Sequence, residues 1–464
     1  MARALPKSAS LRARRWDALV LGGALGGLAA AVKLGRAGLR VCVVEEEEAA
    51  RLPNFLREPF FLPGLAGEGP LDASLRELGL PPIERRDLVA DPVAFQVLLP
   101  EARVDVGRAQ LLASELVSWG LAKPEDAEAA VAALSEAGRA ADAYLSALEW
   151  VRRGGLRRFA RGARETALPA PLPGRLRSPE PALRRLLQTW VRALSGLAST
   201  TPRDEALARL LAAPLAGGAA FSHPDAGLRA LLQRRIEALH GEFRTVSGPF
   251  RLAELGGDPG IARIGPDDLW LGRALIVNAP GARLAAALRG WQQEVPRWLR
   301  GPEPAGREVR VHARALREVV PEPLARRSLL ASASGGCGSA AWPVTLALEP
   351  SARGARFVEL VAGAVFPADA ELAAAEDTIS AALVRLLPFA GNRVRRANPP
   401  ALPRWDDDLA RFDAPPGAWP AALELRAGRR PIYALAREHV AALGAEGEIL
   451  LGARAGDAIL ADLS

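Results

Sequence analysis

The sequence predicts an α/β fold that opens with a Rossmann-like nucleotide-binding domain on a parallel sheet and also contains a second, α+β domain. Residues 17–45 show the order strand, glycine-rich turn, helix and strand, which is typical of a Rossmann-like dinucleotide-binding unit. Further strand and helix patterns return at 217–290 and near the C-terminus, after long helical and strand-rich segments. The 464 residues are 49% hydrophobic, which is enough for two or three domains.

The first unit can be justified element by element. Residues 17–22 form a short apolar run of the kind found in buried parallel strands. The apolar residues that follow the turn recur at helical spacing until Gly38, which is a typical residue for ending a helix. Residues 39–45 predict a second strand that ends in the acidic residue Glu45, at the position where such units accept hydrogen bonds from a ribose.

The turn departs from the dinucleotide fingerprint at its middle position. Gly22 and Gly27 occupy the first and third glycine positions, but Ala24 stands where the backbone normally approaches a pyrophosphate. The residues expected to contact a nucleotide cofactor in this unit are Gly22, Gly23, Ala24, Gly26, Gly27 and Glu45. The alternative is a structural turn of the same shape that binds nothing.

The composition argues against several classes of function. The net charge is +7, but only three of the 60 basic residues are lysines, so the arginine excess indicates a compositional bias rather than a nucleic-acid-binding surface. Cys42 and Cys337 are far apart and the four histidines are scattered, so we expect neither a disulfide framework nor a metal site. The expected location is the cytoplasm, and we expect no transmembrane helix.

Five segments in order resemble the FAD-dependent oxidoreductases of the phytoene desaturase type, which are related to the flavin amine oxidases. The opening unit is the first of them. The others are a helix with a hairpin, a turn–helix–strand, a strand–helix and a C-terminal segment, at 69–81 with 95–107, 221–243, 269–288 and 443–463. The resemblance implies an FAD cofactor and oxidation or isomerisation of a hydrophobic substrate such as an isoprenoid. It singles out no catalytic residue.

The resemblance also implies how the two domains alternate along the chain. The nucleotide-binding domain is expected in three parts, separated by a helical substrate or lid region and by a substrate domain. In chain order the expected parts are 16–107 (nucleotide-binding), 108–216 (helical), 217–290 (nucleotide-binding), 291–430 (substrate domain) and 431–464 (nucleotide-binding).

Several family features are altered in this chain. Besides Ala24, the segment 45–55 begins with four glutamates and contains no glycine pair to line the FAD phosphates. Counting from a strand at 448–451, Ala453 and Arg454 stand where the family has a Gly-Asp pair that faces the flavin ribityl chain. Arg454 is therefore a further candidate cofactor contact, since an arginine can pair with a phosphate. The closing helix of the family is expected to be cut short.

These departures leave two main hypotheses and one weaker one. The first is an active FAD-dependent oxidoreductase of the phytoene desaturase type. The second is a degenerate, non-catalytic relative that has lost flavin binding and binds a lipid or a protein partner. Binding of NAD(P) in place of FAD is less favoured, because the C-terminal segment still resembles the closing part of a flavin domain.

One cluster of arginines predicts a partner surface. Arg153, Arg157, Arg161 and Arg164 fall close to one helical face, which is typical of a basic helix that lies on an anionic membrane. A solvated arginine face is the plainer interpretation, and no nucleic-acid-binding module accompanies the cluster. The chain is thus expected in the cytoplasm, with contact to the inner face of the membrane as an open alternative.

Three minor candidates are given little weight. Cys337 lies in a glycine-rich stretch without a nucleophile motif. The acidic run at 405–409 lacks the spacing of a calcium loop and is expected to be solvated. His223 lies in a turn of the family type and either faces the flavin cavity or caps the following helix.

Overall fold

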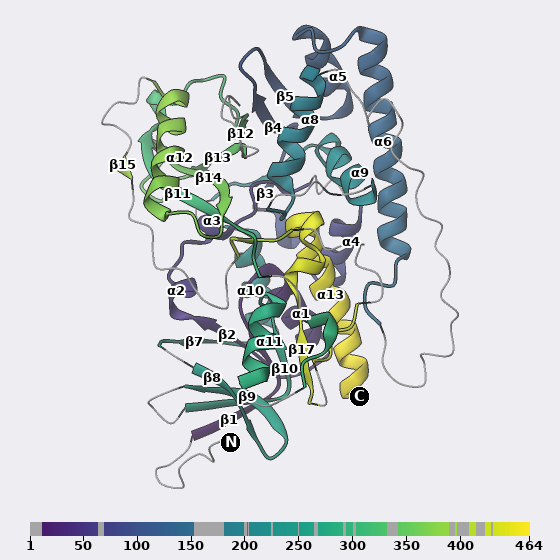
Figure 1. Cartoon of the computed structure of the whole chain (residues 1–464), viewed down its shortest axis with the longest axis vertical. Coiled ribbons are helices and arrows are strands. Elements are labelled where there is room, and N and C mark those ends of the chain that lie inside the picture. Colours follow the sequence, from purple (N-terminus) through teal and green to yellow (C-terminus); the bar gives the residue numbers. More distant parts are fainter. Residues whose placement is uncertain are drawn as a thin grey trace.

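A computed structural model describes most of the chain, and Figure 1 shows how its elements are arranged. The described residues are 12–63, 69–152, 181–198, 202, 204–223, 226–248, 250–263, 268–290, 294–299, 303–331, 342–388, 395–396, 408–413, 423–427 and 430–464. One sheet occupies the lower part of the view. A second sheet lies above it on the left and a group of helices above it on the right.

The first sheet is formed by strands that are far apart in sequence. Its order is β7–β2–β1–β10–β9–β8, with β17 beside β10. Five strands, β7, β2, β1, β10 and β17, run parallel to one another. Strands β9 and β8 extend the sheet in the antiparallel direction. Their bounds are β1 (Arg12–Leu21), β2 (Val41–Glu46), β7 (Glu242–Val246), β8 (Phe250–Leu255), β9 (Asp258–Arg263), β10 (Asp268–Val277) and β17 (Ile432–Ala434).

Helices cover both faces of the first sheet. The side chains of β1 alternate between two hydrophobic cores, one on each face of the sheet, because successive side chains of a strand point to opposite faces. Ala18 and Val20 pack under the helices of one face, and Leu19 and Leu21 pack toward α11 on the other. The helices of the first face are α1 (Leu25–Arg36), α4 (Pro70–Glu77), α10 (Leu228–Ala238) and α13 (Gly444–Leu463), and α11 spans Gly281–Gly290.

The second sheet is mostly antiparallel and belongs to the other domain. Its order is β15–β11–β14–β13–β12–β4–β5, with β16 beside β11, and only β12 and β4 are paired in parallel. Helix α12 (Leu372–Leu386) packs on the part formed by β11 and β14. The bounds are β4 (Val93–Leu98), β5 (Arg103–Gly107), β11 (Gly306–Leu316), β12 (Arg327–Leu330), β13 (Val344–Pro350), β14 (Phe357–Pro367), β15 (Arg395–Arg396) and β16 (Ala410–Arg411).

A group of helices packs on the β4–β5 end of the second sheet. Phe95 of β4 is fully buried against Trp190 of α8, with ring centroids 6.2 Å apart. The helices of this group are α5 (Ala109–Ser118), α6 (Pro124–Ala147), α8 (Pro181–Leu194) and α9 (Asp204–Ala212). Short elements complete the described chain: α2 (Glu47–Ala50), α3 (Asn54–Arg57), and the paired strands β3 (Leu88–Asp91) and β6 (Gly218–Phe221).

Most of the expected elements are confirmed. The opening strand, helix and strand form β1, α1 and β2, and the helix at 69–81 and the turn–helix–strand at 221–243 are present as α4 and as α10 with β7. The described part of 108–216 is mainly helical, as the composition predicts. The order and apolar spacing of these segments thus predicted the individual elements of the α/β fold.

The hairpin at 95–107 lies on a different sheet from the one expected. The sequence places residues up to 107 in the nucleotide-binding domain, but β4 and β5 extend the second sheet through β12. The physical reason is burial: Phe95 and Val97 pack under α8 and its neighbours rather than toward α1.

The C-terminal segment also differs from the expectation. The strand placed at 448–451 is wrong, because Gly444–Leu463 form one 20-residue helix, α13. The expected shortening of the closing helix is wrong for the same reason. Small residues allow α13 to pack closely on α1: a Cβ on Gly452 would lie 2.9 Å from the Cβ of Ala29 and closer still to the carbonyl of Gly26.

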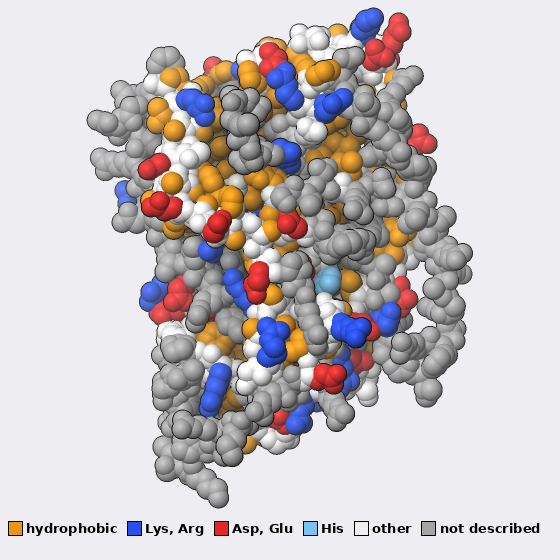
Figure 2. Space-filling model, in the orientation of Figure 1, with side chains coloured by type: hydrophobic (Ala, Val, Ile, Leu, Met, Phe, Trp, Pro, Cys, Tyr) orange, Lys and Arg blue, Asp and Glu red, His pale blue; other side chains and the backbone are white. Residues whose placement is uncertain are grey.

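Some predictions concern residues outside the described part of the chain. Arg153, Arg157, Arg161, Arg164 and Cys337 are among them, so the membrane-facing arginine face stays a prediction. Among the described helices, none combines the length and the apolar content needed to cross a bilayer. On the face shown in Figure 2, acidic and basic side chains are interspersed over the surface.

The α1–α13 contact gives a test of the fold. Gly452→Ala places a methyl group against the backbone of α1, so we expect a loss of about 1–3 kcal/mol in the free energy of unfolding. Gly290→Ala is the matched control, since a Cβ at this helical glycine meets nothing within 4 Å. Chemical denaturation of both variants measures the difference, and equal stabilities would contradict the close packing of α1 and α13.

Candidate functional site

The turn after β1 is held by the residue that follows β10. The backbone N–H of Asn278 donates to the carbonyl of Leu21 at 2.9 Å, and its Nδ2 donates to the carbonyl of Ala24 at 3.2 Å. Gly22 has φ of 99°, and a Cβ there would lie 2.7 Å from the Asn278 carbonyl oxygen. A Cβ on Gly27 would lie 2.6 Å from the carbonyl oxygen of Gly22. Backbone packing therefore requires both glycines, whether or not a ligand binds.

The N-terminus of α1 lies on the wall of a cavity between the two sheets. Ala24 is the N-cap residue, is 3% exposed and lines the cavity together with Leu25. Gly26 faces α13 instead, where a Cβ would be 3.1 Å from the carbonyl oxygen of Glu448. The structure thus brings the residues of the opening turn together, but it divides them between the cavity wall and helix packing.

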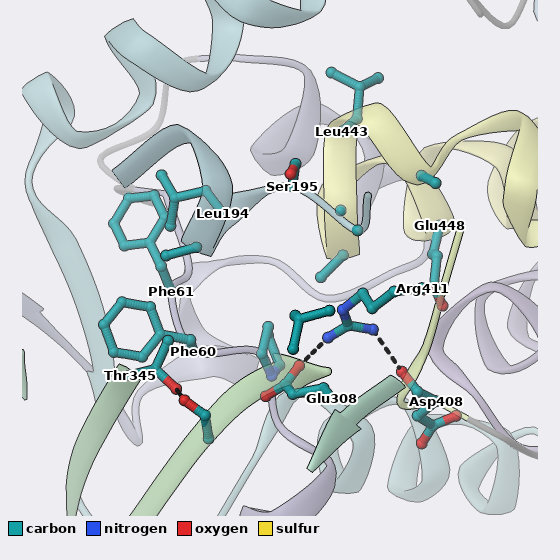
Figure 3. A pocket seen from close by; sticks show the side chains of 18 of the residues that line it. Phe60, Phe61, Leu194, Ser195, Glu308, Thr345, Asp408, Arg411, Leu443 and Glu448 are labelled. Carbon is teal, nitrogen blue, oxygen red and sulfur yellow. Dashed lines mark hydrogen bonds and ion pairs between the residues drawn. The ribbon is translucent and has the colours of Figure 1, made fainter. Parts of the chain in front are cut away.

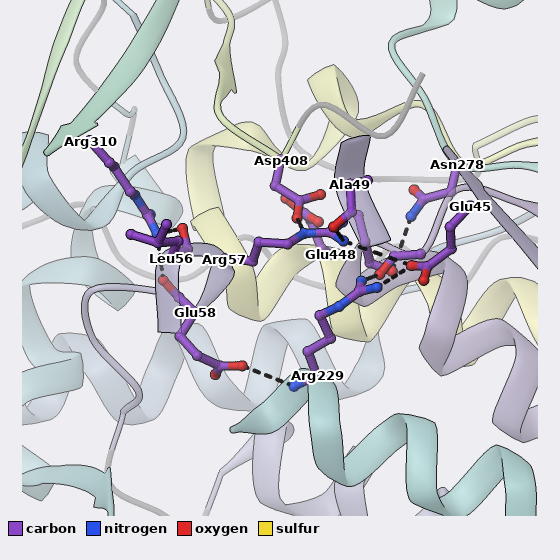
Figure 4. A network of polar contacts seen from close by, with 12 residues as sticks. Glu45, Ala49, Leu56, Arg57, Glu58, Arg229, Asn278, Arg310, Asp408 and Glu448 are labelled. Carbon is purple, nitrogen blue, oxygen red and sulfur yellow. Dashed lines mark hydrogen bonds and ion pairs between the residues drawn. The ribbon is translucent and has the colours of Figure 1, made fainter. Parts of the chain in front are cut away.

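The carboxylate expected to bind a ribose is paired with arginines. Glu45 lies near the end of β2 and is 6% exposed. Arg229 of α10 donates from Nη2 to Glu45 and from Nη1 to the carbonyl of Gly23. Arg57 Nη1 lies 3.8 Å from the same Glu45 oxygen, Oε1 (Figure 4). The space that a side chain on Gly23 would need is filled by Glu45 and Arg229. Both guanidiniums therefore satisfy Glu45 from inside the protein.

A second carboxylate, which is half-buried, positions Arg229. Glu58 accepts hydrogen bonds from the backbone N–H groups of Leu228 at 2.9 Å and Arg229 at 3.2 Å, at the N-terminus of α10. These N–H groups have no partner within the helix, so Glu58 acts as a cap supplied by another part of the chain. Burial raises the pKa of Glu58 to about 7, against the opposing effect of the two N–H groups. Glu58 thereby fixes the end of the helix that carries Arg229.

The network continues from Arg57 to α13. Arg57 Nε donates to the carboxylate of Asp408, and Arg437 Nη2 donates to the Asp408 carbonyl at 3.0 Å. The same atom, Arg437 Nη2, also donates to Glu448 Oε1 at 2.6 Å. Burial opposes ionisation of Asp408, but Arg57 and Arg437 keep its pKa lowered. A chain of ion pairs therefore connects β2 with the first turns of α13.

The cavity lies between this network and the second sheet and has a volume of about 120 Å³. Figure 3 shows the rings of Phe60 and Phe61 on one side of it, with Arg411 on the other side between Glu308 and Asp408. The same cavity reaches the N-termini of both α1 and α13. It is therefore the place where ligand atoms could meet both helix N-termini and the second sheet.

The lining of the cavity is strongly charged. Among the described lining residues, six are arginines and four are acidic: Arg57, Arg192, Arg229, Arg310, Arg411 and Arg437, and Glu308, Asp408, Glu446 and Glu448. Arg310 and Arg411 both pair with Glu308 and lower its pKa to about 2, although burial opposes its ionisation. The lining therefore carries many charged groups beside its apolar residues.

Sequence reasoning missed the arginines of the site. Arg57 and Arg229 were not singled out, because an arginine in so arginine-rich a chain carries little information. Asp408 belongs to the acidic run at 405–409 that was expected to be solvated, and it lies in the cavity wall instead. One feature of the sequence could have predicted them: Glu45 follows an apolar strand, and a buried carboxylate needs a cationic partner.

Arg454 does not lie on the cavity. It is on the exposed side of α13, and its Nη1 donates to Glu77 of α4 at 3.3 Å. The strand that precedes α13 is β17, and the residues that follow it are Leu435 and Ala436, both 1% exposed. The positions expected for the Gly-Asp pair, Ala453 and Arg454, therefore lie within helix α13 and not in a loop after a strand.

The remaining candidates lie away from the cavity. His223 lines a small separate pocket with Glu58 and Arg327. Within the described ranges, no group of three histidine, cysteine or acidic side chains is arranged to hold a metal ion.

Comparison with known proteins identifies the fold. No protein-family model matches the chain, and none of the curated proteins matches it. Among solved structures, a cofactor-binding variant of putrescine oxidase has 15% identity and a TM-score of 0.56, covering 97% of this chain and 100% of that chain. Cyclohexylamine oxidase from Brevibacterium oxydans has 15% identity and a TM-score of 0.54, with coverage of 97% and 99%. An oxidoreductase from Methanosarcina mazei has 15% identity and a TM-score of 0.53, with coverage of 93% and 99%.

The chain therefore has the flavin amine oxidase-type fold, which confirms the fold expected from the resemblance. At these identities the likeness establishes architecture.

The side chains of this region do not fit the ADP half of FAD. Glu45 is paired with Arg229 and Arg57, and Arg229 covers Gly23. The cavity of about 120 Å³ is small beside the roughly 300–1,000 Å³ of pockets that bury larger ligands.

Glu58 predicts how stability depends on pH. Its pKa of about 7 in the folded protein exceeds the ordinary 4.5, so the folded state binds more protons between these values. The free energy of unfolding should therefore fall as pH rises from about 4.5 to about 7. Glu58→Gln should remove a part of this fall on the order of 1–3 kcal/mol, measured by denaturation across that range.

Two other observations complete this test. Burial also raises the pKa of Glu438 to about 7, so a smaller slope should remain in Glu58→Gln. Glu84→Gln changes an exposed carboxylate and is the matched control, which should keep the slope of the unmodified protein. An unchanged slope in Glu58→Gln would contradict the half-buried helix cap.

Proposed function

We propose that this protein is a non-catalytic relative of the flavin amine oxidases, which binds a small ligand in the cavity without flavin chemistry. The observation that carries the proposal is the insertion of Arg229 between Glu45 and the carbonyl of Gly23. A guanidinium at this point takes up the hydrogen-bonding capacity that a dinucleotide ribose would need.

Other features of the described site support the same proposal. Ala24 adds a methyl group at the cavity wall, at the turn position where the backbone normally approaches a pyrophosphate. Each lost charge-assisted hydrogen bond weakens FAD binding by roughly 1.5–3 kcal/mol, so a few such losses reduce affinity by several powers of ten. Loss of hydrogen bonds to FAD need not destabilise the fold. Gly22 and Gly27 are required by backbone packing even without a ligand.

A second candidate function is an FAD-dependent, amine-oxidase-like oxidoreductase. It is favoured by one observation: the N-termini of α1 and α13 both reach a single cavity, and helix N-termini bind anionic groups such as phosphates. This function would require Arg229 and Arg57 to move away from Glu45. A hydrophobic substrate is not favoured by the charged lining, and membrane contact through the arginines at 153–164 stays a prediction.

An absorbance spectrum distinguishes the two functions. The protein is purified, and its visible spectrum is recorded before and after incubation with excess FAD and removal of the free flavin. Our proposal predicts no flavin bands in either sample, because Arg229 and Arg57 occupy Glu45. Flavin bands in either sample would overturn it in favour of the oxidoreductase.

Two arginine variants test the cause. Arg229→Ala frees Glu45 and opens the space over Gly23, so this variant should retain more FAD than the unmodified protein. Arg234→Ala is the matched control on the same helix, where the side chain is half exposed and lies 3.9 Å from Asp87. Equal FAD retention in the two variants would show that Arg229 is not what closes the site.

A further inference from the structure

One arginine of the cavity has no acidic partner among the described residues. Arg192 lies in the last turn of α8 and is one of the residues that line the cavity. Its guanidinium lies 5.7 Å from the ring centroid of Trp342, which is a cation–π contact. By contrast, Arg57, Arg229, Arg310, Arg411 and Arg437 each have a carboxylate partner. Arg192 is thus the lining cation that is available for a ligand.

The balance of charge in the cavity points the same way. The described lining residues carry two more positive than negative charges. Glu446 is paired with Arg209, through two hydrogen bonds of 2.8 and 2.9 Å, and is not available to neutralise Arg192. Because charges interact strongly in a partly buried site, this lining attracts an anion and repels a cation.

An apolar surface lies in the same cavity. Phe60 and Phe61 line it, and Phe61 packs edge-on against Phe95 with ring centroids 5.6 Å apart. Phe95 in turn packs on Trp190 of α8, the helix that carries Arg192. The aromatic stack thus ties the apolar wall to the helix with the available cation.

The size of the cavity limits the ligand. Its volume of about 120 Å³ is similar to the roughly 150 Å³ of an engineered protein cavity that holds one benzene molecule. The cavity therefore matches one ring or a short apolar chain with a single charged group. A larger ligand would have to displace side chains of the wall.

We infer that the cavity binds a small carboxylic acid with an aromatic or apolar body, whose carboxylate pairs with Arg192 and whose body packs on Phe60 and Phe61. This inference rests on the proposed function, since it assigns the ligand class of the same cavity. A carboxylate suits Arg192, because a guanidinium can donate two parallel hydrogen bonds to its oxygens.

The test uses two probes of the same shape and opposite charge. Phenylacetate and phenethylamine are titrated into the full-length protein by calorimetry at neutral pH. We expect phenylacetate to bind at least about 10-fold more tightly than phenethylamine, because an ion pair with Arg192 forms only with the acid. Equal or tighter binding of the amine, or binding of neither probe at millimolar concentration, would overturn the inference.

Variants of α8 assign the effect to Arg192. Arg192→Gln should lower the affinity for phenylacetate about 10-fold or more, whereas Arg192→Lys should keep a larger part of it. Arg185→Gln is the matched control, since Arg185 lies on the same helix and pairs with Glu101 at the surface. Melting curves establish that each variant is folded. Unchanged binding in Arg192→Gln would contradict the assignment.

The outcome is separable from that of the flavin experiment. If the purified protein holds flavin, the proposed function fails, and the charge preference for the two probes can still be measured on the holoprotein. If the protein holds no flavin and shows no preference for the acid, the proposed function stands and the inference about Arg192 fails.

Discussion

A buried carboxylate at the end of β2 is the constraint on which the candidate site depends. Glu45 is almost fully excluded from solvent, and an unpaired charge there would cost several kcal/mol. Arg229 and Arg57 meet this demand from two other segments of the chain. Glu58 then fixes the helix that carries Arg229, and Asp408 pairs with Arg57. The charges around the cavity are therefore balanced mainly by one another, and Arg192 has no carboxylate partner within the described part of the chain.

The fold itself does not require a ligand at this point. Gly22 and Gly27 lack room for a side chain, because Asn278 and the first turn of α1 lie close to them. Gly26 and Gly452 lack room because α1 and α13 cross there. A fingerprint that evolved around a nucleotide can therefore persist for packing alone. The chain thus shares the fold of putrescine oxidase and cyclohexylamine oxidase, whereas Arg229 and Arg57 occupy the carboxylate that a ribose would need.

The sequence predicts the architecture better than the site. Apolar spacing and the order of β1, α1 and β2 define the first domain, because each element has a regular local pattern. The pairing of β4 with β12 is not local, so the hairpin was placed on the wrong sheet. Helix α13 was misread because its apolar run also fits a short strand. Arg229, which donates to Glu45, lies 184 residues further along the chain, and no short motif predicts it.

The most direct test of the account is a double-mutant cycle on Arg229 and Glu45. The free energies of unfolding are measured for the unmodified protein, Arg229→Ala, Glu45→Ala and the double variant. We predict a coupling of about 1–3 kcal/mol, because each side chain satisfies the other inside the protein. The exposed pair Arg185 and Glu101 is the reference and should give less than about 1 kcal/mol. A coupling near zero for Arg229 and Glu45 would contradict the account.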